Sequence, residues 1–291
     1  MNSAPTPSPA QGTDLLLPRF HIVLSPHYDD LALSIGATMA TVAAAGREVL
    51  DLIVFGTDPA GIALHGFARH HHEAWGVSAS EAIATRRREE AAAVSVLGAS
   101  SGNLPFHDAI YRGDYYTSDE ALFGTPSGAE SDLPQAIALA ATEAATALAG
   151  PDHRPDDASV RFYAPLAIGH HVDHQLVFQA GLILSVKGYV VWLYEDLPYA
   201  MIGSNRADRL AEIATSGLVV ELEPVAAIPA DPGWRQKLDA VLAYPSQLET
   251  VFTNYAGVDA SAAAIDKALS AYHQEIGNGQ RAERFWRFAA P

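Results

Sequence analysis

Two short segments gather ionisable side chains in patterns that suit a metal-dependent reaction. The first is Ser-Pro-His-Tyr-Asp-Asp at residues 25–30, directly after an apolar run that starts at Phe20. Three ionisable residues at the tip of a buried strand need an explanation, because burying a charge costs free energy. His27 and Asp30 can converge on one cation across the turn, which leaves Asp29 free. The alternative is that one of the two aspartates only caps the following helix.

The second segment is Gly-His-His-Val-Asp-His at residues 169–174, which follows the apolar run Val160–Ile168. Three histidines exceed what helix capping requires, although a surface helix start remains the structural alternative. The sequence contains no Cys, so any metal must bind His, Asp or Glu. The two segments together offer nitrogen and oxygen ligands: His27, Asp30 and one or two of His170, His171 and His174. Such a set suits a Zn²⁺ ion that keeps one coordination position open.

Alternating strand-like and helix-like segments place both clusters at strand ends. The predicted strands are 20–25, 49–55, 104–106, 160–168 and 188–194, and the predicted helices are 31–45, 80–97, 133–148 and 173–185. This alternation predicts an α/β fold with a mostly parallel sheet and helices on both faces. Ligand sites of such sheets lie outside the carboxyl ends of the strands. A strand at 218–222, helices at 233–252 and 259–273, and an apolar end at 285–288 predict a C-terminal α/β extension from about residue 200.

The first 18 residues are predicted to be a disordered tail, because they are rich in Pro, Ser and Ala and lack the basic and apolar regions of a signal peptide. Residues 19–291 are predicted to form a single domain. No run of about 18 apolar residues occurs, so a soluble, cytoplasmic protein is expected.

The acidic composition limits which classes of binding partner are expected. Lys and Arg total 18 against 34 Asp and Glu, which gives a formal net charge of −16. Such a surface repels phosphate backbones and anionic lipids, so neither nucleic acid nor a membrane is an expected partner. A small-molecule substrate is expected, and homo-oligomerisation is left open.

Both clusters carry a family resemblance. Residues 25–30, followed by Gly36, and residues 169–174 resemble the two motifs of the LmbE/PIG-L family of zinc-dependent N-acetylglucosaminyl deacetylases. Tyr28 replaces the second proline of the usual Pro-His-Pro-Asp-Asp and leaves every ionisable group in place. Arg-Arg-Glu-Glu at 87–90 with Leu-Gly at 97–98, and Lys237 with Tyr-Pro-Ser-Gln at 244–247, extend the resemblance over most of residues 20–290. It implies a Rossmann-like fold with an added C-terminal region.

The resemblance also implies a ligand set and a base. One zinc ion per chain would bind His27, Asp30 and His174, and other divalent metals would suit the same groups. Asp29 would be the general base, because a carboxylate beside a metal-activated water can accept its proton.

Three further residues receive roles by the same resemblance. His171 is the candidate donor to the oxyanion, and Asp173 would orient the ring of His171 or of a ligand histidine. Arg87 would hold a substrate hydroxyl or phosphate; the alternative is that it lies on a solvated helix face. Whether His171 or Asp29 protonates the leaving amine stays open.

The predicted activity is zinc-dependent hydrolysis of an N-acyl amide, with acetyl as the expected acyl group, on an amino sugar or amino-sugar glycoside. The alternative is a zinc amidase that acts on a non-sugar amide or thiol conjugate. A binding protein with a degenerate site is disfavoured, because such a site has no need for Asp29. Substrate selection is predicted to lie in the connections 58–79 and 108–132 and in the segment Tyr194–Tyr199.

Overall fold

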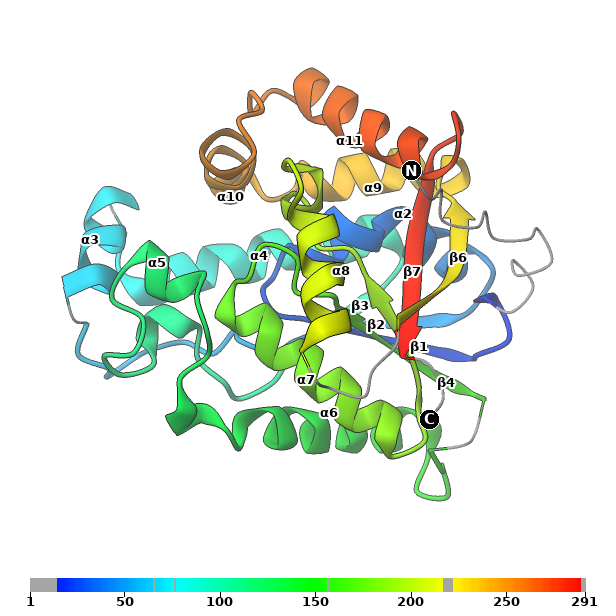
Figure 1. Cartoon of the computed structure of the whole chain (residues 1–291), viewed down its shortest axis with the longest axis horizontal. Helices are drawn as coiled ribbons and strands as arrows, with labels where there is room; N and C mark the ends of the chain where they lie inside the picture. Colours follow the sequence, from blue (N-terminus) through cyan, green and yellow to red (C-terminus); the bar gives the residue numbers. More distant parts are fainter. Residues whose placement is uncertain (1–14, 65, 76, 156–157, 217–221, 289–291) are drawn as a thin grey trace.

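The computed structural model describes residues 15–64, 66–75, 77–155, 158–216 and 222–288. At its centre these residues form a seven-stranded sheet with the order β3-β2-β1-β4-β5-β7-β6 (Figure 1). The strands are β1 (Phe20–Ser25), β2 (Glu48–Ile53), β3 (Ser100–Asn103), β4 (Val160–Pro165), β5 (Val190–Tyr194), β6 (Leu222–Pro229) and β7 (Ala282–Phe288). Strands β1 to β5 are parallel, and β7 runs antiparallel to β5 and β6. The predicted α/β class with a mostly parallel sheet is confirmed.

Helices cover both faces of this sheet. On one face α2 (Asp30–Ala44), α4 (Ala79–Leu97) and α9 (Trp234–Val241) contact one another, and on the other α6 (Leu133–Ala149) packs against α7 (Val172–Val186). In Figure 1 the first group lies above the sheet and the second below it. Strands β1 and β4 are buried along their whole length, as expected for central parallel strands covered on both faces.

The remaining described helices belong to neither of these two groups. They are α3 (Gly66–Trp75), α5 (Asp119–Leu122), α8 (Asn205–Thr215), α10 (Pro245–Leu248), the π-helical η6 (Glu249–Tyr255) and α11 (Ala262–Ile276), with 3₁₀ turns such as η2 (Ala109–Tyr111). Helix α3 falls within a connection that was expected to be a loop. Strand β3 spans the polar residues 100–103 and not 104–106 as predicted, because it is an edge strand that pairs only with β2 and needs no apolar run.

The strand order reverses between β1 and β4. From β1 the chain continues outward to β2 and β3, whereas β4 leads to β5 on the other side. The two strands are parallel neighbours, with Phe20 opposite Val160 and Val23 opposite Tyr163. The loops after β1 and β4 therefore diverge from adjacent strand ends, which is where open α/β sheets form their ligand sites.

Two C-terminal side chains hydrogen-bond to the backbone of helix α2 where this helix is interrupted. Helix α2 has non-helical backbone angles at Ile35 (φ −132°, ψ 20°). Glu283 of β7 accepts hydrogen bonds from the backbone N–H groups of residues 37–38, and Lys237 of α9 donates to the carbonyl of Ser34 at 3.1 Å and to Glu283 at 2.7 Å. The buried ion pair thus satisfies backbone groups that the break leaves without helical partners.

Some predicted segments lie partly outside the described residues. Residues 1–14 of the predicted tail do so, but Leu15 is buried in the core, so ordered chain starts before residue 19. Of the predicted strand 218–222 only Leu222 is described, as the first residue of β6. The assignment of residues 19–291 to one domain stays a prediction. Across the described residues, no helix has both the length and the apolar character that crossing a bilayer requires.

Replacing Glu283 with Gln should lower the free energy of unfolding by about 3 kcal/mol or more, because it leaves the buried Lys237 charge without its counter-ion. Chemical denaturation measures this loss. The control Glu275→Gln removes an exposed partner of Arg206 and should cost at most about 1 kcal/mol. Equal small losses in the two variants would show that the buried pair does not support the broken helix.

Candidate metal centre and active site

The turn after β1 presents three ionisable side chains to the end of the sheet. Asp30 is the first residue of α2, and its carboxylate accepts a hydrogen bond from the backbone N–H of His27 at 2.8 Å. Asp29 stands at the N-cap position of α2, but its side chain makes no capping hydrogen bond. Asp29 and Asp30 are both buried. Helix capping therefore does not account for Asp29.

The turn after β4 requires a left-handed backbone. Gly169 has φ 91° and His170 has φ 64°. A Cβ atom on Gly169 would lie 2.6 Å from the ring of Tyr199, so both the conformation and the contact favour glycine. His171 then occupies the N-cap position of α7, and His174 lies in its first turn.

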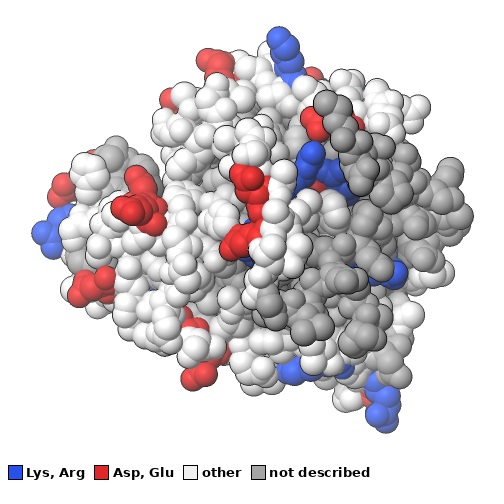
Figure 2. All heavy atoms as spheres, in the orientation of Figure 1, with Lys and Arg blue, Asp and Glu red and all other residues white. Residues whose placement is uncertain are grey.

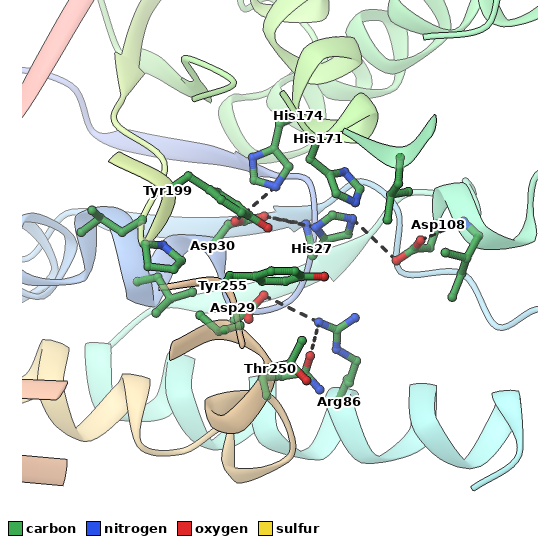
Figure 3. Close-up of a pocket in the computed structure, with 17 residues that line it drawn as sticks. His27, Asp29, Asp30, Arg86, Asp108, His171, His174, Tyr199, Thr250 and Tyr255 are labelled. Atoms are coloured by element: carbon green, nitrogen blue, oxygen red, sulfur yellow. Dashed lines mark hydrogen bonds and ion pairs between the residues drawn. The ribbon is translucent and has the colours of Figure 1, made fainter. Parts of the chain in front are cut away.

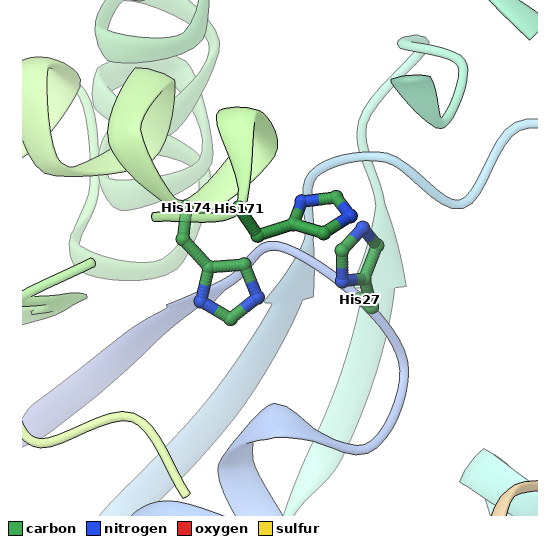
Figure 4. A group of neighbouring side chains, drawn as sticks. All are labelled: His27, His171 and His174. Carbon is green, nitrogen blue, oxygen red and sulfur yellow. The ribbon is translucent and has the colours of Figure 1, made fainter. Parts of the chain in front are cut away.

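The three histidines of the two turns meet in space, as Figure 4 shows. One ring nitrogen from each of His27, His171 and His174 lies within 4.8 Å of the others. The Asp30 carboxylate approaches two of these rings: Oδ1 is 3.6 Å from Nε2 of His174, and Oδ2 is 3.9 Å from Nδ1 of His27. Groups from both predicted clusters therefore converge.

A carboxylate fixes the far side of the His27 ring. Nε2 of His27 donates to Oδ2 of Asp173 at 3.0 Å, so the proton sits on Nε2 and the lone pair of Nδ1 faces Asp30. Oδ1 of Asp173 accepts from Arg112 at 2.6 Å. Burial opposes ionisation of Asp173, but the Arg112 charge and the His27 hydrogen bond hold its pKa below the usual range.

A second carboxylate fixes His174 in the same way. Nδ1 of His174 donates to Oδ1 of Asp196 at 2.6 Å, and the other oxygen of Asp196 accepts from the backbone N–H of Ile168. Nε2 of His174 is left facing Asp30. Burial lowers the pKa of His174, but Asp30 and Asp196 outweigh it and raise that pKa to about 9. The surroundings of this ring therefore favour a positive charge.

These contacts fit a divalent cation. Metal-binding histidines almost always donate their second ring nitrogen to a carboxylate or carbonyl, and both His27 and His174 do so here. The nitrogens that remain both face Asp30. Two nitrogens and one carboxylate are a donor set that suits zinc and related metals.

His171 differs from the other two histidines. Its Nδ1 accepts a hydrogen bond from the backbone N–H of Asp173 at 3.2 Å, so the proton of the neutral ring sits on Nε2. Burial and then the neighbouring His27 lower the pKa of His171 well below its ordinary value. The ring packs edge-on against Phe123. His171 is thus placed as a neutral hydrogen-bond donor.

A pocket of about 120 Å³ opens over these groups (Figure 3). Its floor comes from the turns after β1 and β4, and its walls come from α4, the connection around Asp108, the segment after β5 and η6. Asp29 and Arg86 face each other across it, with Arg86 Nη2 3.8 Å from Asp29 Oδ1. The lining residues are His27, Asp29, Asp30, Leu33, Arg86, Asp108, Ile110, Leu122, His171, His174, Leu197, Pro198, Tyr199, Gln247, Thr250, Val251 and Tyr255.

The family model for GlcNAc-PI de-N-acetylase (PIG-L) matches residues 22–184. The chain belongs to the PIG-L family. It is 32% identical over 198 residues to the 2'-N-acetylparomamine deacetylase of Niallia circulans, covering 62% of this chain and 68% of the relative. The Streptomyces fradiae protein of the same name is 29% identical over 238 residues, 78% of this chain and 73% of its own length. A crystal structure of a deacetylase from the biosynthesis pathway of teicoplanin is 25% identical, has a TM-score of 0.68, and covers 93% of this chain and 98% of that one.

Membership of the PIG-L family confirms the resemblance and the predicted reaction class, hydrolysis of an N-acyl amide. The structure brings five of the predicted site residues into one pocket: His27, Asp29, Asp30, His171 and His174. Asp173 lies behind them on His27, one of the two partners considered for it. His170 points away, with its ring 3.6 Å from Glu212. The individual roles of these residues stay predictions.

Arg87 does not line the pocket of this PIG-L protein. Its guanidinium donates to the hydroxyl of Tyr28 at 3.2 Å and lies 3.4 Å from the carbonyl of Gly56. The preceding residue, Arg86, takes the place that was expected for Arg87. One position along an α-helix turns a side chain by about 100°, which is enough to separate the two arginines.

Several residues around the metal centre belong to no motif that assigns them there. Asp196 falls in the segment predicted to select substrate, although its place just after β5 also puts it at the strand ends where the site forms. Arg112 and Asp108 come from a connection without regular periodicity, and Tyr255 comes from η6. No local pattern connects these residues with the histidines.

Replacing Asp196 with Asn should weaken metal binding by about 10-fold to 100-fold, because His174 loses the carboxylate that fixes its ring. Competition with a chromophoric chelator measures the affinity. Asp208→Asn, on the exposed face of α8, is the matched control and should bind metal as the wild type does. Unchanged affinity in the Asp196 variant would remove this residue from the metal centre.

Proposed function

We propose that the protein is a zinc-dependent deacetylase that removes the N-acetyl group of an amino sugar or amino-sugar glycoside. His27, Asp30 and His174 would hold one zinc ion per chain. The observation that carries the proposal is the position of Asp29: a buried carboxylate without a capping role that lines the same pocket as the ligands. When bound, zinc would supply Lewis-acid activation of the amide carbonyl and of water.

Asp29 would act as the base. It accepts a proton from the attacking water as the new carbon–oxygen bond forms. Arg86 Nη2 lies 3.8 Å from Asp29 and also donates to Gln247 at 2.7 Å, so the guanidinium forms an ion pair with the carboxylate while Gln247 holds it in place. Arg86 takes over the substrate-holding role proposed above for Arg87, because its side chain reaches the pocket.

His171 would stabilise the oxyanion. The backbone hydrogen bond to its Nδ1 leaves Nε2 as a donor, and the ring stands next to both His27 and His174. A neutral ring has only this one proton to donate. We therefore propose that the proton on Asp29 passes to the amine as the carbon–nitrogen bond breaks, which yields acetate and the free amine.

The amino-sugar substrate is supported by the relatives. Both curated relatives are named for N-acetylparomamine, and the structural neighbour belongs to teicoplanin biosynthesis. The acidic net charge disfavours polyanionic substrates. On the face shown in Figure 2, Lys and Arg side chains form no continuous patch that would attract one. A cytoplasmic location belongs to the same proposal.

Replacing Asp29 with Asn should lower kcat by about 10²-fold to 10⁴-fold, the usual cost of losing a general base, while metal remains bound. Release of acetate from N-acetylated amino sugars measures turnover, and elemental analysis measures metal. Asp132→Asn, an exposed helix-start residue without a capping hydrogen bond, is the control and should retain full activity. Full activity of the Asp29 variant would refute the mechanism, and loss of its metal would make Asp29 a ligand.

A further inference from the structure

A second cavity adjoins the pocket of the metal centre. Its volume is about 260 Å³, against about 120 Å³ for the metal pocket. The two cavities share part of their walls: Arg86, Asp108, Ile110, Gln247 and Thr250. The two cavities are therefore neighbours, and none of the residues proposed as ligand, base or oxyanion donor lines the second cavity.

The walls that belong to the second cavity alone are uncharged, and three of their six residues are apolar. They are formed by Val77, Ala82, Ile83, Thr85, Tyr111 and Ser246. The polar ends of two of them are already engaged, because the Tyr111 hydroxyl pairs with His72 at 2.8 Å and the Ser246 hydroxyl donates to Glu89 at 2.6 Å. Such a lining suits a ring or chain without charge.

Arg86 is part of the wall that both cavities share. Nε of Arg86 is buried and has no hydrogen-bond partner among the described residues, although Nη2 of the same side chain donates to Gln247. The Arg86 guanidinium is therefore held at the shared wall through Gln247, which also lines both cavities.

The size of the second cavity indicates which end of the substrate it receives. The acyl group of the proposed reaction is acetyl, whose single methyl group needs little room. We propose that the second cavity is a subsite for an uncharged aryl or alkyl aglycone, carried by an amino sugar whose N-acetyl group sits at the metal centre. This inference rests on the proposed function and names its substrate class.

Binding of two product-like probes tests the subsite without turnover. Titration calorimetry compares glucosamine with phenyl β-glucosaminide, and burial of the phenyl ring should make the glycoside bind about 10-fold more tightly. Ala82→Phe fills the second cavity and should abolish this preference. Ala84→Phe, on the exposed side of the same helix and outside both cavities, is the matched control and should retain it.

Turnover supplies the second readout. The ratio of kcat/KM for phenyl N-acetyl-β-glucosaminide to that for N-acetylglucosamine should fall about 10-fold in Ala82→Phe and stay constant in Ala84→Phe. Equal affinity of the wild type for both probes would overturn the subsite, a result that does not depend on folding of any variant. Tighter binding of a glucosaminide with a polycationic aminoglycoside ring as its aglycone than of phenyl β-glucosaminide would overturn the proposed aglycone class. Preferential phenyl binding without hydrolysis of either acetylated sugar would support the cavity and refute the proposed function.

Discussion

The carboxyl ends of β1 and β4 lie side by side because the strand order reverses between them. This adjacency joins His27 to Asp173, which are 146 positions apart in the sequence. Without it, each cluster would be a turn with a few polar side chains.

The same adjacency brings buried carboxylates close together, which costs electrostatic free energy. Asp30, Asp173 and Asp196 are buried together. Asp173 pairs with Arg112, whereas Asp30 and Asp196 both face the ring of His174. Burying carboxylates without compensation is costly, so the arrangement favours a bound cation. The C-terminal region contributes at a distance, because the Lys237–Glu283 pair supports the broken helix whose first residue is Asp30.

The sequence predicted the sheet and both clusters because that information is local. Apolar runs mark the buried strands, and residues 25–30 and 169–174 are each contiguous. Asp196 could not be assigned to His174 from sequence, because their contact depends on β5 lying next to β4. Choosing Arg86 over Arg87 requires the rotation of α4 relative to the pocket. The edge strand β3 lacks the apolar pattern that reveals the inner strands.

An anomalous scattering map of crystals grown with zinc tests the central claim most directly. We expect one zinc ion per chain, bound to Nδ1 of His27, Nε2 of His174 and the carboxylate of Asp30, with His171 unbound. Zinc on His171, which the mutual distances of the three histidines would also permit, would contradict it. Zinc on Asp29 would contradict it as well, because the base would then be a ligand.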